Sequence, residues 1–311
     1  MNVLLWHVHG SWTTAFVQGR HRYLLPVLPD RGPDGRGRAR TWDWPASAVE
    51  LCPESLRDAE VDVVVLQRPH EADLAERWLG RRPGRDLPAV YVEHDAPPGD
   101  VTGMRHPLAD ADGGVTLVHV THFNALFWDS GTRPARVVEH GVVDPGYRYT
   151  GELRRSAVVI NDAPRRGRTV GADLLPRLGA EVPLDLFGFG NQGLPCAGNL
   201  PQDELHDAMS RRRVYLHPFR WTSLGLSLLE AMHLGMPVVG LATTEAVEAV
   251  PAGAGVLSTD VERLGRAVRE LAEDPERARE MGRAGRSAAL ARYGLCRFLA
   301  DWDGLLAEVT R

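Results

Sequence analysis

The stretch RVYLHPFRWTSLGLSLLEAMHLGMPVVGLATTEAVEAV, residues 213–250, decides the fold. Residues 214–216 are an apolar run of strand length, residues 217–223 read as a loop, and residues 226–234 show helical spacing before a second apolar run at 237–240. This order predicts a βαβ unit of a parallel sheet. The helix begins at Gly225, where unpaired backbone N–H groups and the positive end of the helix dipole favour an anion.

Glu230 lies about one turn inside this predicted helix. Its neighbours Leu228, Leu229 and Met232 suit packing, whereas packing gives no reason for a carboxylate. The alternative interpretation is an exposed helix glutamate that forms a surface ion pair.

The residues from Gly225 onward resemble the carboxy-terminal domain of retaining GT-B glycosyltransferases of the family-4 type (glycosyl transferases group 1). The family pattern has a glutamate, then Gly-Phe-Gly-Leu, and a second glutamate eight positions after the first, followed by Ala-Met and later by Gly-x-Pro-Val-Val. The matching positions here are Gly225, Leu226, Glu230, Ala231, Met232, Gly235, Pro237, Val238 and Val239. Thr222 stands where the first glutamate of the pattern would be, and Ser223 and Leu224 follow it.

The resemblance implies an α/β protein of the GT-B fold, with two Rossmann-like domains facing across a cleft and a carboxy-terminal helix that crosses back to the first domain. Strand-like and helical runs alternate along the whole chain, which predicts largely parallel sheets. The alternation lapses in the Gly-rich turn region 141–155. We therefore expect an acceptor domain at 1–150, a nucleotide-sugar donor domain at 151–292 and a final helix at 293–311.

The composition is that of a globular protein, with 43% hydrophobic and 25% charged residues. The net charge of −5 gives no reason to expect nucleic acid, and no apolar run reaches membrane-spanning length. With no signal peptide recognised, we expect a cytoplasmic protein. Because the sequence contains no lysine, any phosphate clamp must use arginine, which binds bidentately. The Arg-rich segments 31–40 and 81–85 are expected to be solvated loops.

The donor-binding residues follow from the resemblance. It implies that Glu230 accepts the ribose hydroxyls, that Gly225 and Leu226 offer backbone N–H groups to the phosphates, and that Thr222 and Ser223 lie near the donor sugar. Arg166 and Arg168, with Arg165 as a third possibility, would clamp the diphosphate. The glycines of the GFGNQG motif, Gly188 and Gly190, let the chain approach a flat base, although an ordinary turn explains them equally well.

In the first half, His94 follows a predicted strand, and the resemblance implies a histidine there close to the donor sugar. A strand-end structural histidine is the alternative. The loop after the first strand, with Gly10 and Ser11, is a further expected binding surface. His7 is expected in the core.

No metal site is expected. Two Asp-x-Asp patterns occur, at 110–112 ahead of a strand and at 301–303 inside the last helix, and neither has the position that a metal-dependent transferase requires. Three distant cysteines indicate neither a disulfide framework nor a zinc site.

The predicted function is sugar transfer from a nucleoside-diphosphate sugar to a hydroxyl, with retention and without a metal or a further cofactor. A UDP-sugar is the first choice of donor, while uracil, guanine and adenine all stay open. The acceptor is left open between a lipid, a polysaccharide and a small natural product, as are a peripheral membrane contact and the oligomeric state. Thr222 keeps a non-catalytic nucleotide-sugar-binding protein as an alternative. A GT-B sugar-nucleotide epimerase, which would use further carboxylates such as Asp95, is the other.

Overall fold

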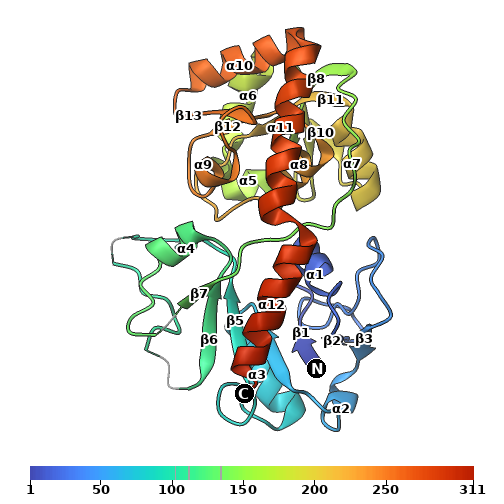
Figure 1. Cartoon of the computed structure of the whole chain (residues 1–311), viewed down its shortest axis with the longest axis vertical. Helices are drawn as coiled ribbons and strands as arrows, with labels where there is room; N and C mark the ends of the chain where they lie inside the picture. Colours follow the sequence, from blue (N-terminus) through green and yellow to red (C-terminus); the bar gives the residue numbers. More distant parts are fainter. Residues whose placement is uncertain (102, 111–112, 134) are drawn as a thin grey trace. The chain divides into compact units, whose positions relative to one another are not determined.

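The computed structural model describes residues 1–101, 103–110, 113–133 and 135–311 (Figure 1). The chain divides into two units. The N-terminal unit consists of Met1–Val143 together with Leu295–Arg311, and the C-terminal unit is Asp144–Gly294. The division observed after Val143 comes before the predicted position at residue 150.

The N-terminal unit is built on a parallel sheet of seven strands in the order β3-β2-β1-β4-β5-β6-β7. The strands are β1 (Asn2–Leu5), β2 (Arg22–Pro26), β3 (Ala48–Leu51), β4 (Val63–Leu66), β5 (Ala89–Glu93), β6 (Val115–His119) and β7 (Ala135–Val137). The helices are α1 (Gly10–Phe16), α2 (Pro53–Leu56), α3 (Glu71–Leu79), α4 (His122–Phe127) and α12 (Leu295–Val309).

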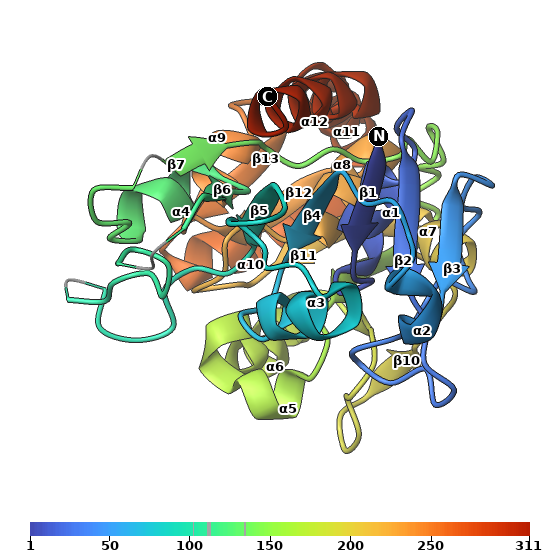
Figure 2. The same cartoon turned by 90° about the horizontal axis from the view of Figure 1, so that it is seen from below.

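Helices cover both faces of this sheet. Figure 2 shows α2 and α3 on one face and α12 on the other, where α12 also contacts α1. The first face buries Leu4, Leu24 and Val64 against Leu74 of α3. On the second face, the Trp12 ring lies 5.7 Å from that of Trp302, centroid to centroid. The last helix of the chain therefore packs on the N-terminal unit, as predicted, and it contacts α1 there.

The C-terminal unit has a parallel sheet of six strands in the order β10-β9-β8-β11-β12-β13. The strands are β8 (Leu153–Val159), β9 (Leu184–Phe187), β10 (Cys196–Gly198), β11 (Arg212–His217), β12 (Val238–Leu241) and β13 (Gly255–Ser258). The α-helices are α5 (Ala163–Arg166), α6 (Leu175–Glu181), α7 (Gln202–Ser210), α8 (Leu226–Leu234), α9 (Ala246–Ala249), α10 (Val261–Glu273) and α11 (Pro275–Tyr293), and two 3-10 turns lie at Gly167–Val170 and Ala172–Leu174.

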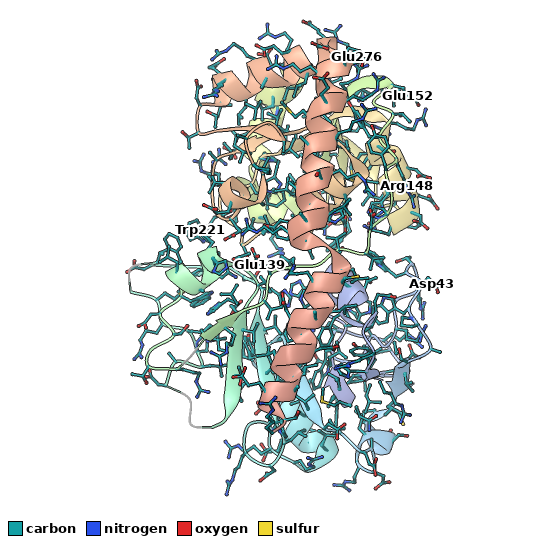
Figure 3. The ribbon with its side chains drawn as sticks, viewed as in Figure 1. Asp43, Glu139, Arg148, Glu152, Trp221 and Glu276 are labelled. Atoms are coloured by element: carbon teal, nitrogen blue, oxygen red, sulfur yellow. The ribbon has the colours of Figure 1, made fainter. Side chains whose placement is uncertain are left out.

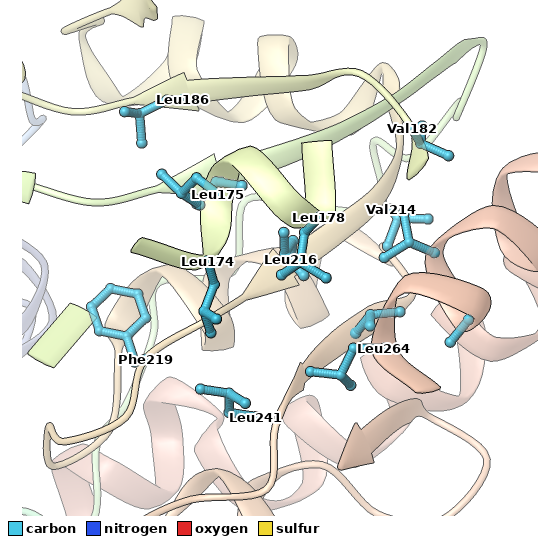
Figure 4. Close-up of a cluster of buried hydrophobic side chains, with 14 of the residues drawn as sticks. Leu174, Leu175, Leu178, Val182, Leu186, Val214, Leu216, Phe219, Leu241 and Leu264 are labelled. Atoms are coloured by element: carbon cyan, nitrogen blue, oxygen red, sulfur yellow. The ribbon is translucent and has the colours of Figure 1, made fainter. Parts of the chain in front are cut away.

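One core of this unit lies between the sheet and the helices α6 and α10. Leu186, Val214, Leu216 and Leu241 of the strands pack with Leu178 of α6, and Leu264 of α10 joins the same cluster (Figure 4). The strands are apolar on both faces because helices cover both, which is typical of parallel sheets. The predicted α/β fold with two Rossmann-like domains is confirmed.

Several predicted elements differ from the structure. The expected loop after the first strand is helix α1, and a single helix expected at 171–178 is replaced by 3-10 turns followed by α6. Strands β3 and β10 were not predicted. Both are short strands at the outer edge of a sheet, and β10 is mostly exposed, so it carries no apolar signal.

Candidate functional site

The candidate site lies where the strand order of the C-terminal sheet reverses. β8 and β11 are neighbours in the sheet although two strands, β9 and β10, separate them in the chain. In parallel sheets, the crevice at the carboxyl ends of two such strands is the usual ligand site. The loops that leave these two ends are residues 160–168 and residues 218–225, which carry the predicted clamp arginines and Gly225.

Gly225 is the N-cap of α8, so no side chain at that position caps the helix. A Cβ atom at Gly225 would lie 2.9 Å from Cε1 of His217, the buried last residue of β11. The glycine therefore allows the imidazole to approach the start of the helix closely. Burial lowers the pKa of His217 to about 3, which keeps the ring neutral.

Glu230 is buried in α8, with 3% of its surface exposed. Its Oε2 atom lies 3.6 Å from Nε2 of His206, which is buried on α7. His206 Nε2 also lies 2.7 Å from the Gln202 side chain. A buried carboxylate needs polar partners. Burial in α8, about one turn behind its start, restricts the positions that the Glu230 carboxylate can take, and His206 is a close polar neighbour. The exposed-glutamate alternative is wrong.

The GFGNQG loop packs against the loop after β8. Gly188 and Gly190 have positive φ, and a Cβ on either residue would overlap the Ile160 carbonyl or the Asp162 carboxylate. Asn191 is buried and joins the two loops: its amide donates to the carbonyl of Ile160 at 2.8 Å and its Oδ1 accepts from Ala163 N–H at 3.0 Å. The glycines therefore serve this loop-to-loop contact.

A hollow of about 400 Å³ lies along the same loop. It is lined by residues 188–194 with Cys196 and Asn199, and Phe189 at its edge is 51% exposed. An exposed aromatic ring beside backbone amides offers a stacking surface for a flat heterocycle.

The three predicted clamp arginines differ in their surroundings. The Arg166 guanidinium lies over the ring of Phe219, with 5.8 Å between its Cζ atom and the ring centroid, and Phe219 in turn stacks on His217 at 4.7 Å. This stack holds Arg166 beside the loop that leads into α8. Arg165 instead pairs with Asp162 at 3.1 Å.

Arg168 is 76% exposed and pairs with Asp173 at 3.1 Å. Arg220, from the loop after β11, binds the same carboxylate at 2.5 and 2.9 Å and donates to the Arg168 carbonyl. The hydrogen bond from Arg220 lowers the pKa of Asp173, so the carboxylate stays charged. In this structure the Arg168 guanidinium is therefore engaged in an ion pair with Asp173.

The remaining predicted donor residues surround the start of α8. Thr222 is half-buried, Ser223 is buried and Leu226 is the first residue of the helix; Trp221 of the same loop is labelled in Figure 3. Ser227, in the first turn, is 2.9 Å from the hydroxyl of buried Tyr215. This contact ties the helix start to β11.

In the N-terminal unit, His94 belongs to a group of three histidines. Its ring lies 4.0 Å from that of His9 and 6.4 Å from that of His140, centroid to centroid. Burial and the neighbouring imidazoles lower the pKa of His94, and burial lowers that of His140 to about 3. Within the described residues the buried Nε2 atom of His94 has no hydrogen-bond partner. A neutral imidazole has one nitrogen that donates a hydrogen bond and one that accepts, so a small conformational change that exposed Nε2 would let it bond to a ligand hydroxyl.

Gly10 and Ser11 form the first turn of α1, directly after His9. The expectation of a loop here is wrong, because Trp12 and Phe16 at helical spacing bury themselves against α12. His7 is half-buried rather than a core residue.

The acids of the two Asp-x-Asp patterns are paired where they are described. Asp110 pairs with Arg105 at 2.8 Å, and Asp112 lies outside the described residues. Asp301 pairs with Arg297, and Asp303 with Arg20 and His21. Across the described ranges, no three His, Cys, Asp or Glu side chains are grouped to hold a metal.

Sequence reasoning missed His206, His217 and Asn191. A signal existed for His206, because Gln202 and His206 lie four residues apart on a predicted helix, but nothing in the sequence pairs that helix with α8.

No helix in the described part of the chain is long and apolar enough to cross a membrane.

Comparison with known protein families indicates the class of protein to which part of the chain is similar. Residues 192–288, about a third of the chain, match the family model described as Glycosyl transferases group 1. The matched segment includes Gly225 and Glu230. The prediction of a glycosyltransferase domain is confirmed by this match. A search of the curated proteins finds no significant match.

Solved structures with the GT-B fold are similar to this chain. HepE from Anabaena, in complex with UDP and glucose, has a TM-score of 0.73 at 15% identity, over 98% of this chain and 99% of that one. Sucrose-phosphate synthase from Thermosynechococcus elongatus has a TM-score of 0.70 at 15% identity, over 99% of both chains. A TarM mutant from S. aureus, in complex with Fondaparinux, alpha-GlcNAc-glycerol and UDP, has a TM-score of 0.64 at 14% identity over 78% of this chain. Only 55% of the TarM chain is covered.

Proposed function

We propose that this protein transfers a sugar from a nucleoside-diphosphate sugar to an acceptor hydroxyl, with retention at the anomeric carbon and without a metal ion. The observation that carries the proposal is the position of Glu230. It is buried beside His206, one turn behind the Gly225 end of α8, at the reversal point of a parallel sheet. The helix end can bind the diphosphate, and the buried carboxylate behind it can bind the ribose hydroxyls. The two groups therefore follow each other along α8 as the diphosphate and the ribose follow each other in a nucleotide.

In this proposal each part of the nucleotide has its own partner. The ribose hydroxyls donate to Glu230, and the diphosphate accepts from the first N–H groups of α8 and from Arg166. The base stacks at the hollow beside Phe189. A UDP-sugar is the first donor to test, because solved structures of the similar proteins HepE and TarM contain UDP.

The chemical step needs no protein nucleophile. The bond from the anomeric carbon to the diphosphate oxygen breaks, and the acceptor oxygen bonds to that carbon on the same face. The acceptor proton goes to an oxygen of the leaving diphosphate. Arg166 and the helix end stabilise the charge that develops there, and this electrostatic effect is expected to lower the barrier most.

Thr222 favours a second candidate function, binding of a nucleotide sugar without transfer. A neutral, half-buried side chain stands where the resembled enzymes have their first glutamate. A protein of this kind would bind UDP yet release no sugar from any donor.

One experiment separates these functions. The protein, kept in EDTA, is incubated with UDP-, GDP- and ADP-sugars and a panel of hydroxyl acceptors, with water as the default acceptor. Nucleotide release is measured, and the first product anomer is identified by ¹H NMR. We expect release from a UDP-sugar and a product with the donor's own anomeric configuration. The opposite anomer would contradict retention, dependence on added metal would contradict metal independence, and binding without release would favour the second candidate.

A further inference from the structure

The N-terminal unit contains a basic hollow that the proposed donor site does not use. It has a volume of about 430 Å³ and lies in the segment that follows β2. Its lining includes His7, Arg31, Arg36, Arg38 and Arg40, with Asp30 as the acidic member. Four arginines and one aspartate among the lining residues give the hollow a positive potential in a protein whose net charge is −5.

Two of the arginines build the frame of the hollow. Arg31 binds Glu50 of β3 bidentately, at 2.8 and 3.0 Å, and this contact lowers the pKa of Glu50. The Arg38 guanidinium donates to the carbonyls of Trp44, Pro45 and Ala48, and its backbone N–H donates to Glu50 at 2.7 Å. Glu50 therefore neutralises much of the frame charge and holds the loop in one conformation.

A glycine makes this frame possible. Gly37 has a φ of +67°, and a Cβ there would lie 2.3 Å from Oε1 of Glu50. Its carbonyl also lies 3.1 Å from Nδ1 of His7. The loop is thus fastened to both β3 and the end of β1, which makes the hollow a fixed feature rather than a chance gap between loose side chains.

The other two arginines carry the charge that is available to a ligand. Arg36 and Arg40 are exposed, and across the described residues neither guanidinium takes part in an ion pair or a hydrogen bond. His7 contributes a half-buried imidazole, and its pKa is lowered by burial and by Arg36. Two unpaired guanidinium groups at a fixed hollow suit a phosphate or a carboxylate, which accept bidentate N–H donors.

We propose that this hollow binds a phosphate group carried by the acceptor, so that the protein glycosylates a phosphorylated molecule. The hollow lies after β1 and β2, at the same carboxyl edge of the sheet from which His9 and His94 follow β1 and β5. The part of this proposal that identifies the ligand as an acceptor rests on the proposed function. The part that assigns phosphate binding to the hollow is independent of that function.

The test uses His7 as a local reporter of occupancy. The ring resonances of His7, assigned by their loss in His7→Gln, are followed by NMR at constant ionic strength while inorganic phosphate or glycerol 3-phosphate is added. The donor site is first saturated with UDP. We expect a saturable shift and a raised pKa of His7, because a bound dianion favours the imidazolium. Arg36→Gln/Arg40→Gln should weaken the response at least tenfold, with UDP binding unchanged.

Arg85→Gln is the matched control, since Arg85 is an exposed arginine in a different loop of the same unit, and it should leave the response intact. The phosphate can belong to a soluble molecule or to a lipid headgroup, and sedimentation with phosphatidylglycerol vesicles against phosphatidylcholine vesicles distinguishes the two. Sedimentation that depends on Arg36 and Arg40 assigns a lipid, and a His7 response to the soluble phosphates alone assigns a soluble acceptor.

Two results would contradict the proposals separately. If His7 responds to neither soluble phosphate and the vesicles do not bind, the hollow is no phosphate site, although UDP binding and sugar transfer can stand. If His7 responds but UDP does not bind, the phosphate site stands and the proposed function falls.

Discussion

The Nε2 atom of His206 on α7 lies 3.6 Å from Oε2 of Glu230 on α8. Both side chains are buried, so the contact orients the carboxylate while it stays shielded from solvent. A carboxylate that is already oriented before the ligand arrives loses little side-chain entropy when it binds two ribose hydroxyls. The affinity for the nucleotide is therefore higher, although the number of contacts is the same.

Replacing this carboxylate should weaken nucleotide binding. Glu230→Gln keeps the size of the side chain but removes its charge, and hydrogen bonds to a charged group contribute about 1.5–3 kcal/mol each. We expect UDP affinity, measured by calorimetry, to fall about 10- to 100-fold. Glu204→Gln, an exposed change on α7, should leave affinity unchanged. Equal affinities for the Glu230 variant and the parent protein would remove Glu230 from the ribose site.

The two predicted clamp arginines should behave differently. Arg166→Gln removes the guanidinium that lies over Phe219 in the loop before α8, and we expect UDP affinity to fall about tenfold or more, consistent with the loss of one charge-assisted hydrogen bond. Arg168 is already paired with Asp173, so Arg168→Gln should change UDP affinity less than about threefold. The reverse order in a calorimetric comparison would assign the clamp to Arg168 instead.

Gly225 should not tolerate even a methyl group. In Gly225→Ala the new Cβ would lie 2.9 Å from the buried imidazole of His217, and overpacking of this kind costs about 1–3 kcal/mol. The displaced helix start should also lose affinity for UDP. Gly304→Ala in α12 meets no atom within 4 Å and should raise stability by about 0.5–1 kcal/mol. Urea unfolding of both variants checks the contrast, and an equally stable Gly225→Ala would contradict the contact.

Mild acid should destabilise the protein through its buried histidines. Burial lowers the pKa values of His140 and His217 from 6.5 to about 3 in the folded protein. Below pH 6.5 the unfolded chain therefore takes up protons that the folded chain does not, so stability present above pH 6.5 is lost as the pH falls. Each such histidine contributes a slope of up to about 1.4 kcal/mol per pH unit between these pKa values.

The measurement is urea unfolding at pH 7, 6 and 5. His217→Leu, which cannot be protonated, should give a shallower loss of stability with falling pH, even if it is less stable at every pH. His122→Gln removes an exposed histidine and serves as the comparison. Parallel slopes for His217→Leu and the parent protein would contradict the expectation.

The parallel sheets and the α8 region were predictable because their signals are local. Apolar strands covered on both faces, and the spacing from Gly225 to Glu230, are visible in one continuous stretch. Contacts between distant segments were not predictable. Nothing near Glu230 in sequence points to His206, and nothing near Arg166 points to Phe219, over whose ring its guanidinium lies.

The arginine-rich loop 31–40 is a second case in which contacts between distant segments could not be predicted from the sequence. Its composition indicates a solvated loop, and Arg36 and Arg40 are indeed exposed. Arg31 and Arg38, however, are held by Glu50 and by backbone carbonyls from the segment that leads into β3. Because β3 itself was not predicted, its carboxylate could not be identified as the partner that turns this loop into a hollow.

Helix α12 comes last in the chain yet belongs to the unit that contains the first strand. As the protein emerges from a ribosome, Trp12 and Phe16 must therefore remain without Trp302 until residues 144–294 have been translated. The C-terminal unit is therefore complete in the nascent chain before the N-terminal unit, whose sheet has been translated but still lacks α12. Nascent chains halted before α12 should expose this aromatic surface to chaperones, and release of the final residues should bury it.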